Sequence, residues 1–317
     1  MGVAPVPARV SSYESPLAVV VIAMAGGFAE PERGVNRATA AVPELVERAF
    51  HRSSRRTGME TIIGILFPVT FIAALILERV FPARPLPRVK GWLLKGIAFF
   101  VMSAVLGGVV PALLADAVAA HAPLKLAGFG AVYGGLLAFV ASDLFSYGLH
   151  RLLHSVPFIW RWTHQMHHSA ERMDVAGATY FHPLDILIQA GLANVVVGLL
   201  GVTPDAALIA GYLAFFANIF QHLNVKTPRW LGYVIQRPEA HAVHHERGVH
   251  AYNYGNFLMI WDIVLGTFRN PEGFAENAGF WHGASSRTLA MLFGRDVGQP
   301  PVPAPARAGH ATPVAAE

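Results

Sequence analysis

The chain of 317 residues contains no cysteine. This absence excludes disulfide bonds, thiolate catalysis, and zinc or iron–sulfur sites with cysteine ligands. Histidine and carboxylate side chains are therefore the only strong metal ligands that the chain can offer.

Charged residues are also scarce. They make up 14% of the chain, whereas hydrophobic residues make up 54%. A soluble domain usually carries about 25% charged residues, so exposure to a bilayer is the simplest explanation. The net charge of +4 is modest, and the arginines mostly stand beside apolar segments. We interpret them as membrane-orienting charge and expect no nucleic-acid partner.

Several catalytic motifs are missing as well. The sequence has no GxSxG elbow, no P-loop and no GxGxxG, so hydrolase, NTPase and dinucleotide-binding functions have no support. The segment HHERGVH lacks the HExxH spacing of a metalloprotease, because His245 and His250 are five residues apart.

Long apolar runs are present instead. Three of them, residues 61–81, 91–119 and 126–149, are long enough to cross a hydrocarbon core of about 30 Å. Two shorter runs, residues 184–200 and 206–220, flank a GVTPD turn and predict a hairpin that enters and leaves on one side. The fold class predicted is all-α: an integral membrane helical bundle with a cytoplasmic histidine-rich helical cap.

Composition also predicts where the domain begins and ends. We expect residues 1–57 to be a poorly ordered or peripheral N-terminal arm, and residues 58–270 to be the membrane domain. Residues 271–317, which end in a Pro- and Ala-rich stretch, are predicted to be a largely disordered tail.

The chain has 15 histidines, and most of them are clustered in the polar segments that follow the apolar runs. One HxxxH box and two HxxHH boxes contain His150, His154, His164, His167, His168, His241, His244 and His245. His182 and His222 stand alone near the two ends of the predicted hairpin. We consider these ten residues candidate metal ligands, and expect the other isolated histidines, including His250, to be capping or hydrogen-bonding residues.

Spacing favours a metal site with two ions. Residues i, i+3 and i+4 lie on one face of a helix, with Cβ atoms about 5–6 Å apart. Two imidazoles at this spacing can bind one ion, and an adjacent pair can point toward two. The three boxes exceed the three or four protein ligands of a single zinc site.

These boxes, in this order between membrane spans, resemble the fatty acid hydroxylase/sterol desaturase superfamily. FHPLD at residues 181–185 and NYGNFLMIWDIVLGTF at residues 253–268 are similar to further motifs of that family. The resemblance covers residues 60–270. It implies a di-iron centre (Fe2+/Fe3+), with zinc as an alternative occupant after purification. It also implies O2-dependent hydroxylation or desaturation of a sterol-like, hopanoid, carotenoid, acyl or ether lipid.

The resemblance also indicates residues around the ligands. Asn218, one turn before His222, resembles an Asn that lies near the metal in membrane acyl desaturases. Asp185, Asn253 and Asp262 fall within the family-like motifs. We expect carboxylates to orient the histidines by accepting their second N–H; the candidates are Asp143, Asp174, Asp185, Glu239 and Asp262.

No haem-, flavin- or cytochrome b5-like segment is recognisable. Electrons are therefore expected from a separate partner, a ferredoxin or a cytochrome b5-like protein with its reductase. Arg151, Arg161 and Arg237 could steer an acidic donor to the site.

Localisation is predicted at a bacterial inner membrane, with the site facing the cytoplasm. Arg151, Arg161 and Arg172 favour this orientation, whereas the arginines of residues 48–56 favour the opposite one for the N-terminus. The alternative function is a histidine-based metal transporter, or a metal-binding membrane protein without oxidase activity. A transporter would need polar groups inside its spans.

Overall fold

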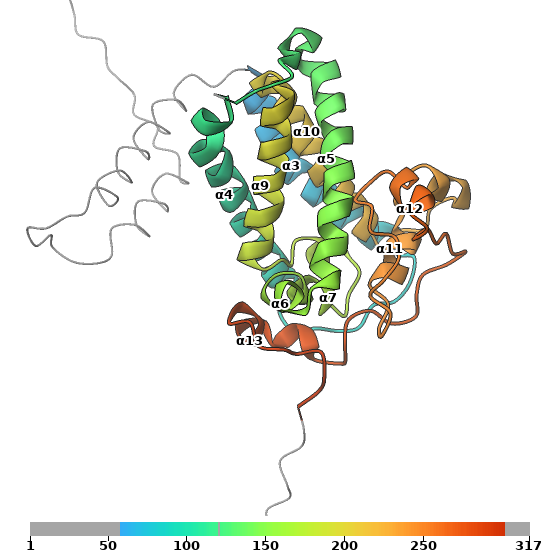
Figure 1. Cartoon of the computed structure of the whole chain (residues 1–317). Coiled ribbons are helices and arrows are strands. Elements are labelled where there is room, and N and C mark those ends of the chain that lie inside the picture. The colour runs from blue at the N-terminus through green and yellow to red at the C-terminus, as the bar shows by residue number, and fades with distance from the viewer. Residues whose placement is uncertain (1–57, 120, 302–317) are drawn as a thin grey trace, which may run out of the picture. The chain divides into compact units, whose positions relative to one another are not determined.

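The structure is a computed structural model that describes residues 58–119 and 121–301 (Figure 1). Within these residues the regular elements are helices, accompanied by two isolated β-bridges, so the predicted all-α fold is confirmed. The predicted N-terminal arm and the residues after 301 lie outside the described part of the chain.

Five long helices form the bundle. They are α3 (Gly58–Val80), α4 (Trp92–Ala119), α5 (Gly130–Ser155, preceded by the 3-10 helix η1, Leu126–Phe129), α9 (Pro183–Leu200) and α10 (Pro204–His222). Among the described residues, four segments are long and apolar enough to cross a membrane: α3, α4 as far as Pro111, η1 with α5, and α9. The second arm of the predicted hairpin, α10, is not one of them.

The order of packing is not the order of the sequence. Helix α10 packs against α3 and α5, while α9 packs against α4 and α5 (Figure 1). Small residues allow α5 and α10 to approach closely, and Ala138 and Ala217 are fully buried there. A Cβ atom on Gly135 of α5 would lie only 2.8 Å from the Ile209 Cβ of α10.

Local sequence signals fix the ends of α9 and α10. Helix α9 begins with Pro183, and the backbone N–H of Leu184 donates to the side chain of the preceding His182. It ends at Gly201, whose φ of 62° is a left-handed conformation. Thr203 then caps α10 by accepting a hydrogen bond from the Ala206 N–H. The two helices therefore turn back on each other, as the GVTPD segment predicted.

Short helices complete the chain on the side of the histidine boxes. Figure 1 shows α6, α7 and α13 beyond the ends of α9 and α5. These elements are α6 (Pro157–Trp162), α7 (Gln165–His168), α8 (Val175–Ala178), η2 (Arg229–Tyr233), α11 (Pro238–His244), α12 (Ile260–Val264), η3 (Ala284–Ser286) and α13 (Thr288–Leu292).

The folded part of the chain extends past the predicted boundary at residue 270. Met291 and Val297 belong to a core cluster that also contains Met166 and Tyr180. The Tyr180 hydroxyl donates to the Ser285 carbonyl at 2.9 Å. The segment from residue 271 to 301 is therefore packed against the HxxHH region, where the sequence predicted a disordered tail. Its few apolar residues are scattered, so no periodic pattern revealed them.

Candidate metal centre

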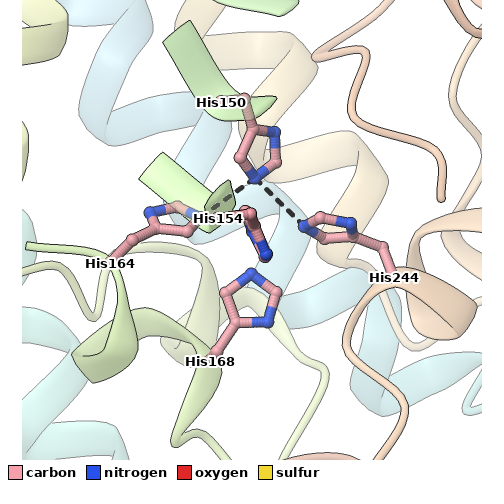
Figure 2. A group of neighbouring side chains, drawn as sticks. All are labelled: His150, His154, His164, His168 and His244. Atoms are coloured by element: carbon pink, nitrogen blue, oxygen red, sulfur yellow. Dashed lines mark hydrogen bonds between the residues drawn. The ribbon is translucent and has the colours of Figure 1, made fainter. Parts of the chain in front are cut away.

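Nine histidines converge in two groups that could each hold a metal ion. Their nearest ring nitrogens lie within 4.8 Å of one another in each group. Figure 2 shows the larger group, with the rings turned toward a common centre. It contains His150, His154, His164, His168 and His244, and the smaller group contains His167, His222, His241 and His245.

Two long helices and two short ones supply both groups. His150 and His154 are one turn apart on α5, and His222 is the last residue of α10. The two HxxHH boxes lie on α7 and α11, which are helices of only four and seven residues. The members of each adjacent pair belong to different groups: His168 and His244 to the larger, His167 and His245 to the smaller.

Hydrogen bonds on the outer side of the rings set the orientation of four of them. The Nδ1–H groups of His150, His244 and His222 donate to the carbonyls of Tyr254, Tyr252 and Asn218, at 2.8, 2.7 and 2.7 Å. His164 donates through Nδ1 to the Asp185 carboxylate at 2.7 Å. A neutral imidazole has one N–H, so each of these rings presents a lone pair on Nε2 toward the centre.

The inward nitrogens then face one another at short distances. The Nε2 atom of His150 lies 3.0 Å from the Nε2 atoms of His164 and His244 (Figure 2). In the smaller group the Nε2 atom of His222 lies 3.2 Å from those of His167 and His241. In the larger group the protons of His150, His164 and His244 are on Nδ1, so their facing Nε2 lone pairs repel each other unless a cation lies between them. In the smaller group His241 accepts a hydrogen bond from the Gln236 amide on Nδ1, so a neutral His241 carries its proton on the inward Nε2.

Burial favours a metal ion over a proton between these nitrogens. His168, His244 and His245 are fully buried. Burial, and then the neighbouring histidines, hold the pKa of His168, His244 and His245 well below the ordinary value of a histidine. The Nε2 atoms of His154 and His168 are buried and have no hydrogen-bond partner in the described structure. The residues present therefore fit a pair of metal ions.

His182, the tenth predicted ligand, is not brought into either group. Its Nδ1 atom accepts the Leu184 N–H, and its Nε2–H points to the Leu292 carbonyl at 3.3 Å. The Pro183 that follows starts α9, so His182 serves as the cap of that helix. The sequence-based assignment of His182 as a metal ligand does not agree with this placement.

The four predicted supporting residues differ in how they reach the histidines. Asp185 contacts His164 directly, and Asn218 contacts His222 through its backbone carbonyl. The Asn218 side chain instead donates to the Ala178 carbonyl. Asp262 accepts the N–H groups of Tyr254 and Gly255, so it holds the loop whose carbonyls receive His150 and His244.

Asn253 stabilises the same loop from within. Its φ of 46° lies in the left-handed region, and its side-chain amide donates to the carbonyls of Ala240 and Arg269. Its Oδ1 atom accepts the Arg269 N–H at 2.7 Å. The other predicted carboxylates, Asp143, Asp174 and Glu239, bind groups away from the histidine rings: Trp261, Trp92 and Thr227, respectively.

His250 is a contact that the sequence analysis missed. Its Nδ1 atom lies 3.2 Å from Nδ1 of His168, and its backbone hydrogen-bonds the His154 ring. Burial and the nearby His164 lower its pKa to about 4. A φ of 43° at His250 turns the chain back toward the larger group. The sequence shows only that His250 lies five residues after His245. This spacing does not predict the turn that brings His250 to the larger group.

The fold and the site define an all-α membrane bundle with buried histidines in two metal-competent groups. Residues 135–267, which include all nine grouped histidines, match the family model for fatty acid hydroxylase. This segment belongs to the fatty acid hydroxylase/sterol desaturase superfamily.

Three curated relatives align with the same part of the chain. The ornithine lipid hydroxylase OlsE of Rhizobium tropici is 34% identical over 139 residues, which are 43% of this chain and 42% of the relative. The very-long-chain aldehyde decarbonylase GL1-9 of Oryza sativa subsp. indica is 31% identical over 140 residues, or 42% and 53% of the two chains. The sphinganine C4-monooxygenase 1 of Arabidopsis thaliana is 25% identical over 135 residues, or 41% and 52%.

The chain spans about half the length of these relatives. No solved structure matches it.

Proposed function

We propose that the protein is a membrane-bound, non-haem di-iron oxidoreductase that uses O2 to hydroxylate or desaturate a lipid. The observation that carries this proposal is the pair of buried histidine groups, in each of which the ring nitrogens converge within 4.8 Å of one another. The family match and the relatives named as a lipid hydroxylase and a sphinganine monooxygenase support the oxidative chemistry.

In this proposal five histidines hold one iron ion and four hold the other. Iron is preferred to zinc because zinc has no redox chemistry of its own. The bound pair would supply the activation of O2. Because all the ligands are nitrogens, the carboxylates do not bind the ions and can instead orient the histidine rings, as Asp185 orients His164.

The chain's own residues orient the site and exclude water from it. The loop carbonyls of Tyr252 and Tyr254 fix two rings of the larger group. Most of the rings are buried, but His154 is partly exposed at the end of α5. Because α5 is one of the four candidate spans, His154 is the ring that an extended lipid would approach from the bilayer.

A separate electron donor completes the proposal. A ferredoxin or a cytochrome b5-like protein would dock near Arg151 and Arg161, which are exposed. Arg237 is not part of this surface, because it is 1% exposed and donates to the carbonyls of Thr227 and Pro271. Reversing the charge of Arg151 and Arg161 should slow electron transfer at low salt; an unchanged rate would mean that these residues only orient the membrane helices.

We place the protein in a bacterial inner membrane with the site on the cytoplasmic side. The rival function, a metal transporter, would need polar ligands along the spans. In the described part of the spans, Glu78 accepts the Val175 N–H, and Asp143 accepts from Leu258 and Trp261. These carboxylates are engaged in holding the fold, which supports an enzyme over a transporter.

The first experiment measures metal content. Protein purified in detergent from iron-supplemented cells should hold about two irons per chain, one for each histidine group. A His167→Ala/His244→Ala variant, which removes one ring from each group, should lose both. Lipid oxidation would then be assayed with a supplied ferredoxin and reductase. If the unmodified protein holds one metal ion or none, and the variant has the same metal content, the di-iron proposal is contradicted.

A further inference from the structure

A cavity of about 620 Å³ lies between the end of α3 and the start of α4. Four arginines and two carboxylates line it, together with Trp92 and Asn224. The arginines are Arg79, Arg84, Arg88 and Arg172, and the carboxylates are Glu78 and Asp174.

The two carboxylates already have partners in the protein. Asp174 accepts hydrogen bonds from the Gly177 N–H, the Trp92 indole and the Arg172 guanidinium. Glu78 accepts the N–H of Val175 at 3.0 Å. Asp174 is thus paired with Arg172, and Glu78 is the one remaining lining carboxylate beside three further arginines.

The arginines have fewer interaction partners than the carboxylates. In the described part of the chain, the guanidinium groups of Arg79 and Arg88 are exposed and have no ion-pair or hydrogen-bond partner. The Nε atom of Arg84 is buried and unpartnered. The cavity thus presents excess positive charge with donor groups, which suits a phosphate-type anion.

The position of the cavity favours a lipid as the source of the anion. Both α3 and α4 are candidate membrane spans, and the cavity lies where the first ends and the second begins. Leu93 lines it, and the adjacent Val80 and Phe81 are 59% and 62% exposed. Arginines at the level of lipid headgroups, next to an exposed apolar face, match an amphiphilic ligand.

We propose that this cavity binds the anionic headgroup of a phospholipid. Arg79 and Arg88 pair with the phosphate. Two lining residues follow metal-site histidines closely in the chain: Asn224 follows His222 by two residues, and Arg172 follows His168 by four. A headgroup held here would fix the depth and position of its lipid beside the histidine groups. The binding itself does not depend on the proposed oxidation.

The test measures binding of dihexanoyl phosphatidylglycerol to the full chain in non-ionic detergent by calorimetry. The unmodified protein should bind it saturably, and more tightly than dihexanoyl phosphatidylcholine or inorganic phosphate. An Arg79→Gln/Arg88→Gln variant should bind it about tenfold more weakly or worse, since the loss of even one hydrogen bond to a charged group is worth about that much. An Arg79→Lys/Arg88→Lys variant, which keeps the charge, should fall between the two.

A matched control removes the same charge elsewhere. Arg287→Gln/Arg295→Gln changes two exposed arginines outside the cavity and should leave binding unchanged. If both double variants lose affinity for the lipid equally, or neither loses any, the proposed binding site is wrong. If inorganic phosphate binds as tightly as the lipid, the anion need not come from a lipid and that part of the proposal is wrong. Metal content, measured on the same samples, should stay at the unmodified level, so a failed fold or a failed di-iron proposal is recognised separately.

Discussion

His150 and His244 face each other through Nε2 atoms 3.0 Å apart, and both are oriented by carbonyls of one loop. His150 donates through Nδ1 to Tyr254, and His244 to Tyr252. Tyr252 and Asn253 both have positive φ angles, 66° and 46°, which turn the two carbonyls toward the rings. The loop after the third histidine box is therefore as much a part of the site as the histidines.

The first prediction separates the two groups. His154→Ala removes one ring from the larger group only, so the protein should keep the ion of the smaller group and lose or weaken the other. Metal analysis of the purified variant should give about one ion per chain, because the four rings of the smaller group are untouched. Retention of two tightly bound ions would contradict the assignment of His154.

His182→Ala is the matched control for that variant. It also removes one imidazole near the boxes, but from the cap of α9. Metal content should remain at two, while stability should fall by about 1 kcal/mol because a helix cap is lost. Loss of a metal ion in this variant would restore His182 as a ligand.

The second prediction concerns the carboxylate behind His164. Asp185→Asn should lower metal affinity by about 10- to 100-fold, because the amide orients the ring less strongly and no longer increases its basicity. The measurement is competition with a chelator of known affinity. Gln189→Ala removes the other partner of the same carboxylate, at 2.7 Å, and should change the affinity by much less.

The third prediction is a dependence on pH. Burial keeps the folded-state pKa of His241, His244 and His245 well below the unfolded value of about 6.5. Above pH 6.5 neither state is protonated at these rings, so their contribution does not change. Below it the unfolded chain takes up protons that the folded site refuses, and stability falls by up to about 1.4 kcal/mol per pH unit and ring.

Thermal unfolding of the metal-free protein in detergent tests this. The midpoint should be nearly level from pH 8 to 7 and should decline steadily from pH 6.5 to 5. Metal retention should decline over the same interval, since protons compete for the ring nitrogens. A midpoint that is level down to pH 5 would show that the rings are not buried as neutral groups.

Much of the scaffold could be predicted from the sequence because hydrophobic length and histidine spacing are local properties. The three long apolar runs correspond to α3, α4 and η1 with α5. Helix α5, however, continues to Ser155, so its last turns, which carry His150 and His154, belong to a candidate membrane span. The apolar run ends before the helix does, because polar residues at a buried site can continue a helix without lengthening its hydrophobic pattern.

The rest depended on contacts that spacing does not encode. His182 caps a helix and joins neither group, and His250 contacts His168 through a turn with φ of 43°. Arg237 carries a charge that composition assigns to the surface, yet carbonyls from distant segments surround it. Each outcome is set by which segments meet in space, and no single window of sequence contains that information.

The fourth prediction concerns the loop that orients His150 and His244. Asn253→Ala removes three hydrogen bonds, to Ala240, to the Arg269 carbonyl and from the Arg269 N–H. It also places a less tolerant residue in the left-handed region. We expect a loss of about 2–4 kcal/mol in stability, seen in thermal unfolding, and weaker binding at the larger group. If stability falls but metal affinity is unchanged, Asn253 stabilises the fold without contributing to metal binding.

The last prediction tests whether the spacing of two helices sets the spacing of the two groups. Gly135→Ala places a methyl group 2.8 Å from Ile209 and 3.1 Å from the Ala206 carbonyl, so α5 and α10 must separate. Overpacking of this kind costs about 1–3 kcal/mol of stability. The unfolding midpoint should fall by about 2–4 °C for each kcal/mol that is lost.

Gly148→Ala is the control on the same helix, because a Cβ atom there meets nothing within 4 Å. It should leave the midpoint unchanged or raise it slightly, since alanine is the better helix former. Helix α5 carries His150 of the larger group, and α10 carries His222 of the smaller. If the helices position the groups, Gly135→Ala should also weaken metal binding while Gly148→Ala does not. Equal metal affinity in both variants would mean that α7 and α11 alone determine the geometry of the site.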